Sequence, residues 1–285
     1  MVDLKAGKSG AAPLGADSAE IAELDEKAVA KLLAADDPES IALLAGWLKA
    51  NAKTFSPAVA EADAKKSGLS AEAACVVLDA LLGRTTADEE ATLKLVELCL
   101  QVIADRITAS LTSGAAASTM QDDPLVSEAV AVVTSNRRSR HSETAIACLA
   151  QAGPGGALVL ARAFDAVRDT SQLYIVRRLQ PEDVIVLGDN VVASLAYSVT
   201  RLAEDLEGRT RDVVLAFVEA LGPVQGMESS EISVDEPLEP GTHVFHARWG
   251  AGIVLSANEE SATIDFSGAG TRTLLRALTT LRRTE

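Results

Sequence analysis

Apolar residues recur at helical spacing through most of this chain, and this restricts its fold more than any other feature. From residue 18 to residue 222, Leu, Val, Ile and Ala stand three and four positions apart, in groups separated by short breaks. Such spacing gives each helix one apolar face, which must pack against another helix. Hydrophobic residues make up 48% of the chain and aromatic residues only 3%. We therefore predict an all-α segment of closely packed helices with small side chains.

Helix-start signals divide this segment into separate helices. Asp37, Ser56 and Asp123 each precede a proline, a pattern typical of a helix N-terminus. Asp88 stands before the longest apolar run. The first helix is predicted to begin at Asp17 or Ser18 and to continue through the apolar residues up to Leu33.

The clearest unit is HSETAIACLAQAGPGGALVLARAFDAV, from His141 to Val167. In it, two apolar helical patterns flank a Gly153-Pro154 corner. This unit resembles a single HEAT-type repeat, in which a helical hairpin stacks on its neighbours to build an α-solenoid. No strict repeat period is visible along the chain. Two arrangements therefore stay open, an irregular HEAT-like α-solenoid and a compact helical bundle.

The hydrophobic period changes near residue 238. Residues 223–237 hold several carboxylates, two prolines and no basic residue, which is typical of a linker. Beyond them, apolar and polar residues alternate as in short β-strands, and a segment this short can bury a core only by curling its sheet. The prediction is a mobile tail over 1–17, a helical body over 18–222, an acidic linker over 223–237 and a small all-β barrel over 238–285.

The C-terminal segment also carries the pattern G-x-x-V-x-H-x-x-W-G-x-G-x-V, formed by Gly241, Val244, His246, Trp249, Gly250, Gly252 and Val254. With ATIDFSGAGTRTLL and TTLRR after it, the segment resembles the C-terminal Tudor-like (SH3-like) domain of the bacterial DNA helicases UvrD and PcrA. It is similar, more loosely, to the RNA-polymerase-interacting domains of CarD-type transcription factors and of the transcription-repair coupling factor. The resemblance covers about a sixth of the chain. It implies a domain that docks on RNA polymerase or a repair protein.

No helicase motor accompanies this segment, because the chain has no G-x-x-x-x-G-K-[ST] motif. What the resemblance leaves is a docking role. The residues that we predict to contact a protein partner are His246, Arg248, Trp249, Arg272 and Arg276. Trp249 fits two roles equally well, a plug of the barrel core and an exposed docking aromatic.

Two sharper interpretations of this segment fail on the sequence. His243 and His246 lack the further ligands of a zinc site, and on a strand their spacing places them on opposite faces. Gly250 and Gly252 are followed by a strand and not by the helix that a phosphate loop requires. We therefore expect one packed and one exposed histidine, and glycines that permit a bulge or close packing under an aromatic ring.

The charge of the chain bears on its partners. The net charge is −15, whereas proteins that coat nucleic acid carry basic stripes, so direct nucleic-acid binding is not expected. Residues 240–285 hold five arginines and four carboxylates and are close to neutral. A second small cluster, Arg137, Arg138 and Arg140, is interpreted as a solvated helix edge.

The sequence offers no catalytic motif, neither G-x-S-x-G nor H-E-x-x-H. No cofactor, metal or small-molecule substrate is expected. No apolar run approaches the roughly 18 residues of a membrane span, and the first residues lack a secretory signal, so a cytoplasmic protein without membrane contact is predicted. Cys75, Cys99 and Cys148 are predicted to be free thiols within apolar helices.

These observations predict a non-enzymatic, bacterial-type adaptor that docks a protein through its C-terminal barrel. The alternative is a helical-repeat scaffold that binds peptides or subunits through its α body, with the barrel as a cap or an oligomerisation element. An enzyme with an unrecognised carboxylate site is the third and weakest hypothesis.

Overall fold

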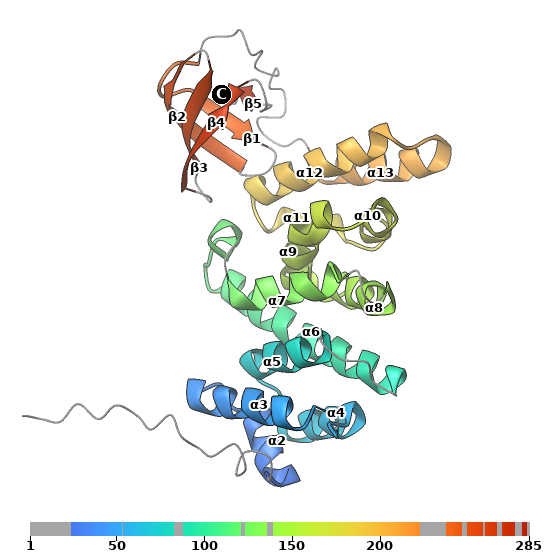
Figure 1. The fold of residues 1–285 in the computed structure, drawn as a ribbon. Helices are drawn as coiled ribbons and strands as arrows, with labels where there is room; N and C mark the ends of the chain where they lie inside the picture. Colours follow the sequence, from blue (N-terminus) through green and yellow to red (C-terminus); the bar gives the residue numbers. More distant parts are fainter. Residues whose placement is uncertain are drawn as a thin grey trace, which may run out of the picture.

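The computed structural model describes residues 24–52, 54–82, 88–120, 123–135, 139–222, 238–246, 250–258, 260–266, 270–276 and 281–283. The predicted tail 1–17 and linker 223–237 lie outside these ranges. Within them, helices occupy the chain as far as residue 220, and strands begin at residue 243 (Figure 1). The predicted order of a mainly helical body and a small all-β unit is confirmed.

The helical body consists of α-helices and two short 3₁₀ helices. Their bounds are α2 (Glu26–Ala34), α3 (Pro38–Ala50), α4 (Pro57–Ser67), α5 (Ala71–Leu82), α6 (Glu89–Thr112), η1 (Ala117–Met120), α7 (Pro124–Val133), α8 (Ser139–Leu149), α9 (Gly153–Ala163), η2 (Phe164–Ala166), α10 (Asp169–Val176), α11 (Pro181–Ile185), α12 (Asp189–Glu204) and α13 (Gly208–Ala220).

Capping aspartates start several helices where the sequence predicts them. The side chain of Asp37 accepts a hydrogen bond from the Ser40 amide (2.9 Å), and Asp88 and Asp123 cap α6 and α7 in the same way. Each bond satisfies one of the amides that a helix leaves unpaired at its N-terminus.

The predicted helix from Ser18 to Leu33 is not continuous, because Leu24 and Asp25 are not helical; residues 18–23 lie outside the described ranges. Asp25 is extended and caps a helix that begins at Glu26, accepting a hydrogen bond from the Ala28 amide at 2.7 Å. A capping carboxylate thus sets the start of α2 inside the apolar pattern, and Leu24 lies before it.

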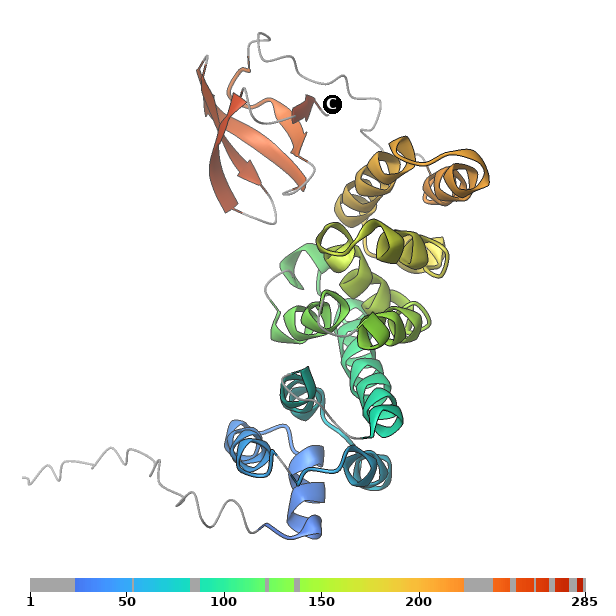
Figure 2. The ribbon, with the colours of Figure 1, turned by 45° about the vertical axis from the view of Figure 1, so that its right-hand side comes forward.

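The helices stack in two layers, so the body is an α-solenoid and not a compact bundle (Figures 1 and 2). Within each layer, every helix contacts the next one of that layer. The predicted hairpin from His141 to Val167 is present as α8 and α9, one helix in each layer. One layer runs α2, α4, α6, α8, α10 and α13, and the other runs α3, α5, α7, α9, α11 and α12.

A single apolar core runs between the two layers and is built mainly from Leu, Val, Ile and Ala. Small buried residues allow helix backbones to approach closely. Ala104, Ala145 and Ala157 are completely buried, and the main-chain oxygen of Ala104 lies against Gly155 of α9. Phe164 is the largest of the fully buried side chains in this core. A core poor in aromatic residues therefore depends on short distances between helices.

The C-terminal unit is an antiparallel sheet of five strands in the order β4-β3-β2-β1-β5. The sheet has its own small apolar core. Its buried residues are Leu238, Val244, Val254, Ala262, Ile264, Phe266, Leu274 and Leu281. The strands are β1 (His243–His246), β2 (Gly250–Ala257), β3 (Ser261–Phe266), β4 (Gly270–Leu275) and β5 (Leu281–Arg283).

The sheet bends over its core without the closure of the predicted barrel. A register shift between Val254 and Ser256 marks a bulge in β2, and bulges increase the local bend and twist of a strand. Among the described residues, β4 pairs only with β3, and the three-residue β5 pairs only with β1. The sheet thus stays open between β4 and β5.

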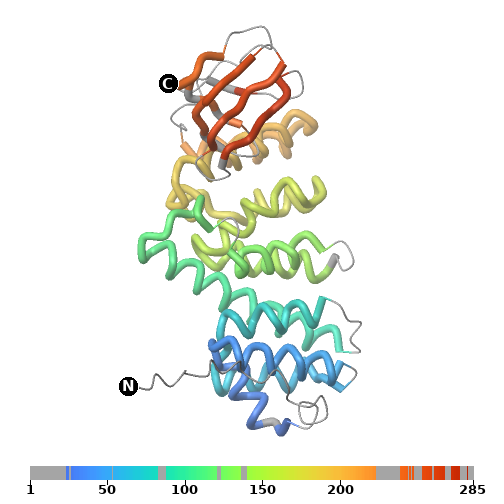
Figure 3. The backbone as a smooth tube through the Cα atoms, turned by 60° about the vertical axis from the view of Figure 1, so that its left-hand side comes forward, coloured from blue at the N-terminus to red at the C-terminus, as the bar shows by residue number. Residues whose placement is uncertain are grey.

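The sheet lies beside the C-terminal end of the helix stack, where β2 contacts α12 (Figures 1 and 3). None of the helices in the described ranges is both long enough and apolar enough to cross a membrane.

Candidate functional site

The sheet packs the first predicted partner contact, His246, against its own core. His246 ends β1, and the centroid of its half-buried ring lies 6.0 Å from that of Phe266, with an angle of 67° between the rings. Such edge-to-face contact stabilises a core, as expected for the packed histidine of the pair. The side chain of His243 lies outside the described residues. In the described part of the chain, no three His, Cys, Asp or Glu residues are grouped so that they could hold a metal ion.

Arg276, another predicted partner contact, is buried and held by hydrogen bonds within the sheet. Its side chain is only 8% exposed, and Nη1 donates a hydrogen bond to the main-chain oxygen of Asn258 at 3.1 Å. The amide of Arg276 donates to the oxygen of Glu260 at 2.9 Å. Arg276 therefore ties the end of β4 to the turn between β2 and β3, which leaves its guanidinium little surface for a partner.

The other predicted contacts divide into two groups. Arg272 is exposed on β4, opposite Ile264 of β3. Arg248 and Trp249 lie outside the described residues, so both roles considered for Trp249 stay open.

The predicted role of Gly252 is confirmed. A Cβ atom at this position would lie 2.7 Å from side-chain atoms of both Ile264 and Phe266. Because real Cβ contacts are longer than this, only glycine lets β2 pass so closely over the core. This glycine serves packing under an aromatic ring.

Sequence reasoning missed the most exposed apolar side chains of β2. Ile253 and Leu255 are 42% and 51% exposed and do not belong to the sheet core, whereas Val254 between them is buried. The period-2 alternation of a strand could have identified them. Large aliphatic side chains exposed next to each other are typical of surfaces that bind proteins.

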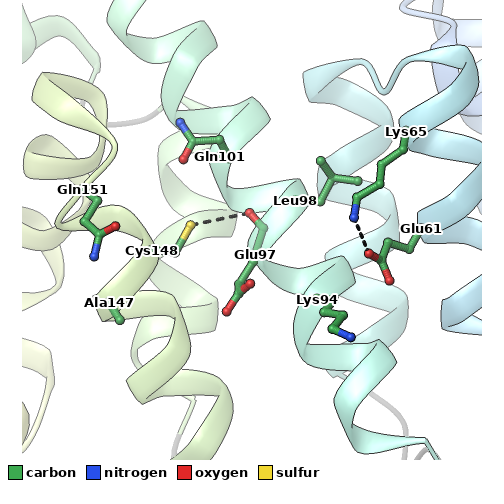
Figure 4. Close-up of a pocket in the computed structure, with 9 residues that line it drawn as sticks. All are labelled: Glu61, Lys65, Lys94, Glu97, Leu98, Gln101, Ala147, Cys148 and Gln151. Atoms are coloured by element: carbon green, nitrogen blue, oxygen red, sulfur yellow. Dashed lines mark hydrogen bonds and ion pairs between the residues drawn. The ribbon is translucent and has the colours of Figure 1, made fainter.

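The helical body contributes a second candidate site, a groove of about 520 Å³ across α4, α6 and α8 (Figure 4). The middle of the groove is a stripe on α6, with α4 on one side and α8 on the other. None of its residues was predicted as a contact. They are Glu61, Lys65, Lys94, Glu97, Leu98, Gln101, Ala147, Cys148 and Gln151.

Ion pairs within helices neutralise the lysines of this groove. Lys65 Nζ lies 2.6 Å from Glu61 Oε1 on α4, and Lys94 Nζ lies 2.8 Å from Glu90 Oε1 on α6. Both pairs have the i, i+4 spacing that favours contact on a helix surface. Glu97 forms no ion pair with any residue that the structure describes.

Cys148 lies at the α8 side of the groove, and its thiol donates a hydrogen bond to the main-chain oxygen of Glu97 (3.5 Å). Burial, together with the smaller effect of the negative charges of Glu97 and Asp105, raises the pKa of Cys148 to about 11. Both carboxylates therefore lie on the side of α6 that faces α8.

The three cysteines are free thiols, as predicted, and they should react in a fixed order. Burial raises the pKa of Cys75 to about 12 and raises that of the fully buried Cys99 further. Because the thiolate is the reactive form, we expect slow alkylation by iodoacetamide at pH 8, in the order Cys148, Cys75, Cys99. Below its pKa, the rate of each accessible thiol should rise about tenfold per pH unit. Peptide mass spectrometry measures the three rates.

In denaturing guanidinium chloride all three cysteines should react alike. Equal rates for Cys99 and Cys148 in the folded protein would contradict the burial of Cys99 in the helical core.

The small arginine cluster at the start of α8 is only partly described. Arg140 Nη1 lies 3.2 Å from Glu89 Oε2, and both side chains are exposed. This surface pair agrees with a solvated helix edge. Arg137 and Arg138 lie outside the described residues.

Comparisons of the chain with protein-family models, with curated proteins and with solved structures gave no match. Its function must therefore be argued from these two surfaces.

Proposed function

We propose that this protein is a non-enzymatic cytoplasmic adaptor that docks a protein partner through its C-terminal sheet. The observation that carries the proposal is the exposed pair Ile253 and Leu255 on β2. Burying two large aliphatic side chains at an interface contributes about 1.5–3 kcal/mol each when burial is complete. The sheet fills its core with other residues, so this pair is available to a partner.

The resemblance of the C-terminal segment to domains that dock on RNA polymerase suggests polymerase or a DNA-repair protein as the partner. The exposed Arg272 adds a positive charge on β4, and charged groups around an apolar contact set its specificity more than its affinity. With a net charge of −15, the protein is expected to reach such assemblies through protein contacts and not through nucleic acid.

The test uses the full chain, immobilised, and purified bacterial RNA polymerase. Ile253→Ser with Leu255→Ser should weaken binding at least about tenfold, because central aliphatic contacts often contribute 1 kcal/mol or more each. Val213→Ser is the matched control, since Val213 is also an exposed aliphatic side chain (46%) and lies on α13, outside the sheet. Surface plasmon resonance measures the affinities, and thermal unfolding shows that the variants stay folded.

Equal affinities of the double variant and the wild type would contradict docking through β2. If the wild-type chain does not bind polymerase, the partner suggested by the resemblance is wrong.

A second function is favoured by the groove across α4, α6 and α8. A two-layer helical stack with an open groove across neighbouring helices of one layer can act as a scaffold that binds segments of other proteins. We propose this scaffold role beside the docking role, because the two surfaces share no residue.

A further inference from the structure

The groove across α4, α6 and α8 has two halves of different charge. In the half between α4 and α6, Lys65 and Lys94 lie beside Glu61 and Glu90, so positive and negative charges balance. A ligand entering this half finds its charges already paired. Selection by charge must therefore come from the other half.

The half between α6 and α8 is acidic. Glu97 lines this half, is exposed and forms no ion pair with a described residue. Asp105, two turns further along α6, lies outside the lining of the groove but adds negative charge on the same side of the helix. The negative charges of both carboxylates contribute to the raised pKa of the Cys148 thiol on α8. A cation placed here would pair with Glu97 without displacing an existing partner, which favours a positively charged ligand.

Side-chain amides accompany these carboxylates. Gln101 Nε2 donates to Asp105 Oδ1 at 2.9 Å, which holds the Gln101 amide on the same stripe of α6 as Glu97. Gln151, in the turn that follows α8, lines the groove and is exposed. An amide group both donates and accepts hydrogen bonds, as a peptide main chain does, so these two residues suit an extended chain.

The dimensions of the groove also fit a peptide. Packed helices lie about 8–10 Å apart, so a path across three of them covers roughly 16–20 Å. An extended chain advances about 3.3–3.6 Å per residue, and about five or six residues would follow this path.

We infer that the groove binds an extended protein segment that carries a lysine or arginine, with Glu97 as the carboxylate that receives its positive charge. Gln101 and Gln151 hold the main chain of the segment, and the balanced half between α4 and α6 accepts its uncharged continuation. This inference rests on the scaffold function proposed above and is independent of docking through β2.

The test probes a cellulose-bound array of acetylated octapeptides with the full chain. The peptides have a Gly-Ser background, and one central position carries each of the amino acids in turn. The wild type should prefer Lys and Arg at this position. Glu97→Gln should reduce the preference about three- to fivefold, as expected for one exposed ion pair, and Glu97→Lys should shift it to Asp and Glu.

Glu219→Lys is the matched control, because Glu219 is an exposed glutamate on α13, outside the groove; it should keep the wild-type preference. Thermal unfolding of each variant confirms its fold. An unchanged preference in Glu97→Lys would overturn the inference and leave the scaffold function standing. Retention of no peptide at all would overturn both. Spermidine that competes as well as a free lysine octapeptide would also overturn the inference, since the groove would then bind a cation and not a protein segment.

Discussion

A single methyl group added at Gly155 is expected to destabilise the helical body severely. The Cβ atom of Gly155→Ala would lie closer than 3.0 Å to the main-chain oxygen of Ala104, and 2.7 Å from Thr108 Oγ1, both on α6. The amide of Gly155 also donates a hydrogen bond to Thr108 Oγ1 at 3.0 Å. A backbone atom cannot rotate away as a side chain can, so α9 must move away from α6.

We expect Gly155→Ala to lower the free energy of unfolding by roughly 3–4 kcal/mol, at the upper end of the costs of overpacking. A domain is stable by only about 5–15 kcal/mol, so the loss is a large share of the total. Urea denaturation followed by circular dichroism measures it. Ala131→Val is the control, because Ala131 is exposed on α7, and its change should stay below about 1 kcal/mol.

A Gly155→Ala protein as stable as the control would show that α9 does not lie this close to α6. The neighbouring Gly156→Ala tests the same principle against α8, since its Cβ atom would meet the main-chain oxygen of Leu149.

The motif around these glycines shows how far the sequence predicts this fold. Gly153 and Pro154 predict a corner by local conformation alone, and Gly153 has the positive φ of 64° that such a corner requires. The roles of Gly155 and Gly156 depend on neighbouring backbones, one of them about 50 residues earlier in α6. Nothing in the local sequence identifies those neighbours.

The same distinction separates the other predictions. Asp37 and Asp88 cap helices through residues three positions away, and they were predicted. The short helices α10 and α11 were not, because eight and five residues are too few to establish a helical apolar period. The sequence predicts Arg276 as a partner contact, whereas its burial depends on Asn258, 18 residues earlier in the turn between β2 and β3.

The two candidate surfaces differ in the same way. Ile253 and Leu255 follow from strand alternation, which a sequence displays directly. The groove combines side chains from three helices separated by loops, and no sequence pattern brings Glu61, Glu97 and Cys148 together. Only the stacking of the helices defines that site.

Phe266→Ala is expected to unfold the C-terminal sheet while leaving the helices intact. Phe266 is 2% exposed and is the largest side chain in the core of the sheet; among the described residues this core holds eight buried side chains and none from the helical body. Removing a buried Phe side chain costs about 3–5 kcal/mol. A core this small rarely supplies more than that, so the substitution removes most of the stability of the sheet.

Hydrogen–deuterium exchange with mass spectrometry distinguishes the two units. Peptides from residues 238–285 should lose their protection in Phe266→Ala, whereas those from α6 should keep theirs. Phe217→Ala is the reciprocal control, because Phe217 is buried in the helical core on α13, and it should leave the sheet protected. Loss of protection in both units of Phe266→Ala would contradict the division at residue 238. Independent unfolding would instead allow docking through the sheet and binding in the groove to be measured separately in one chain, because each could be removed without the other.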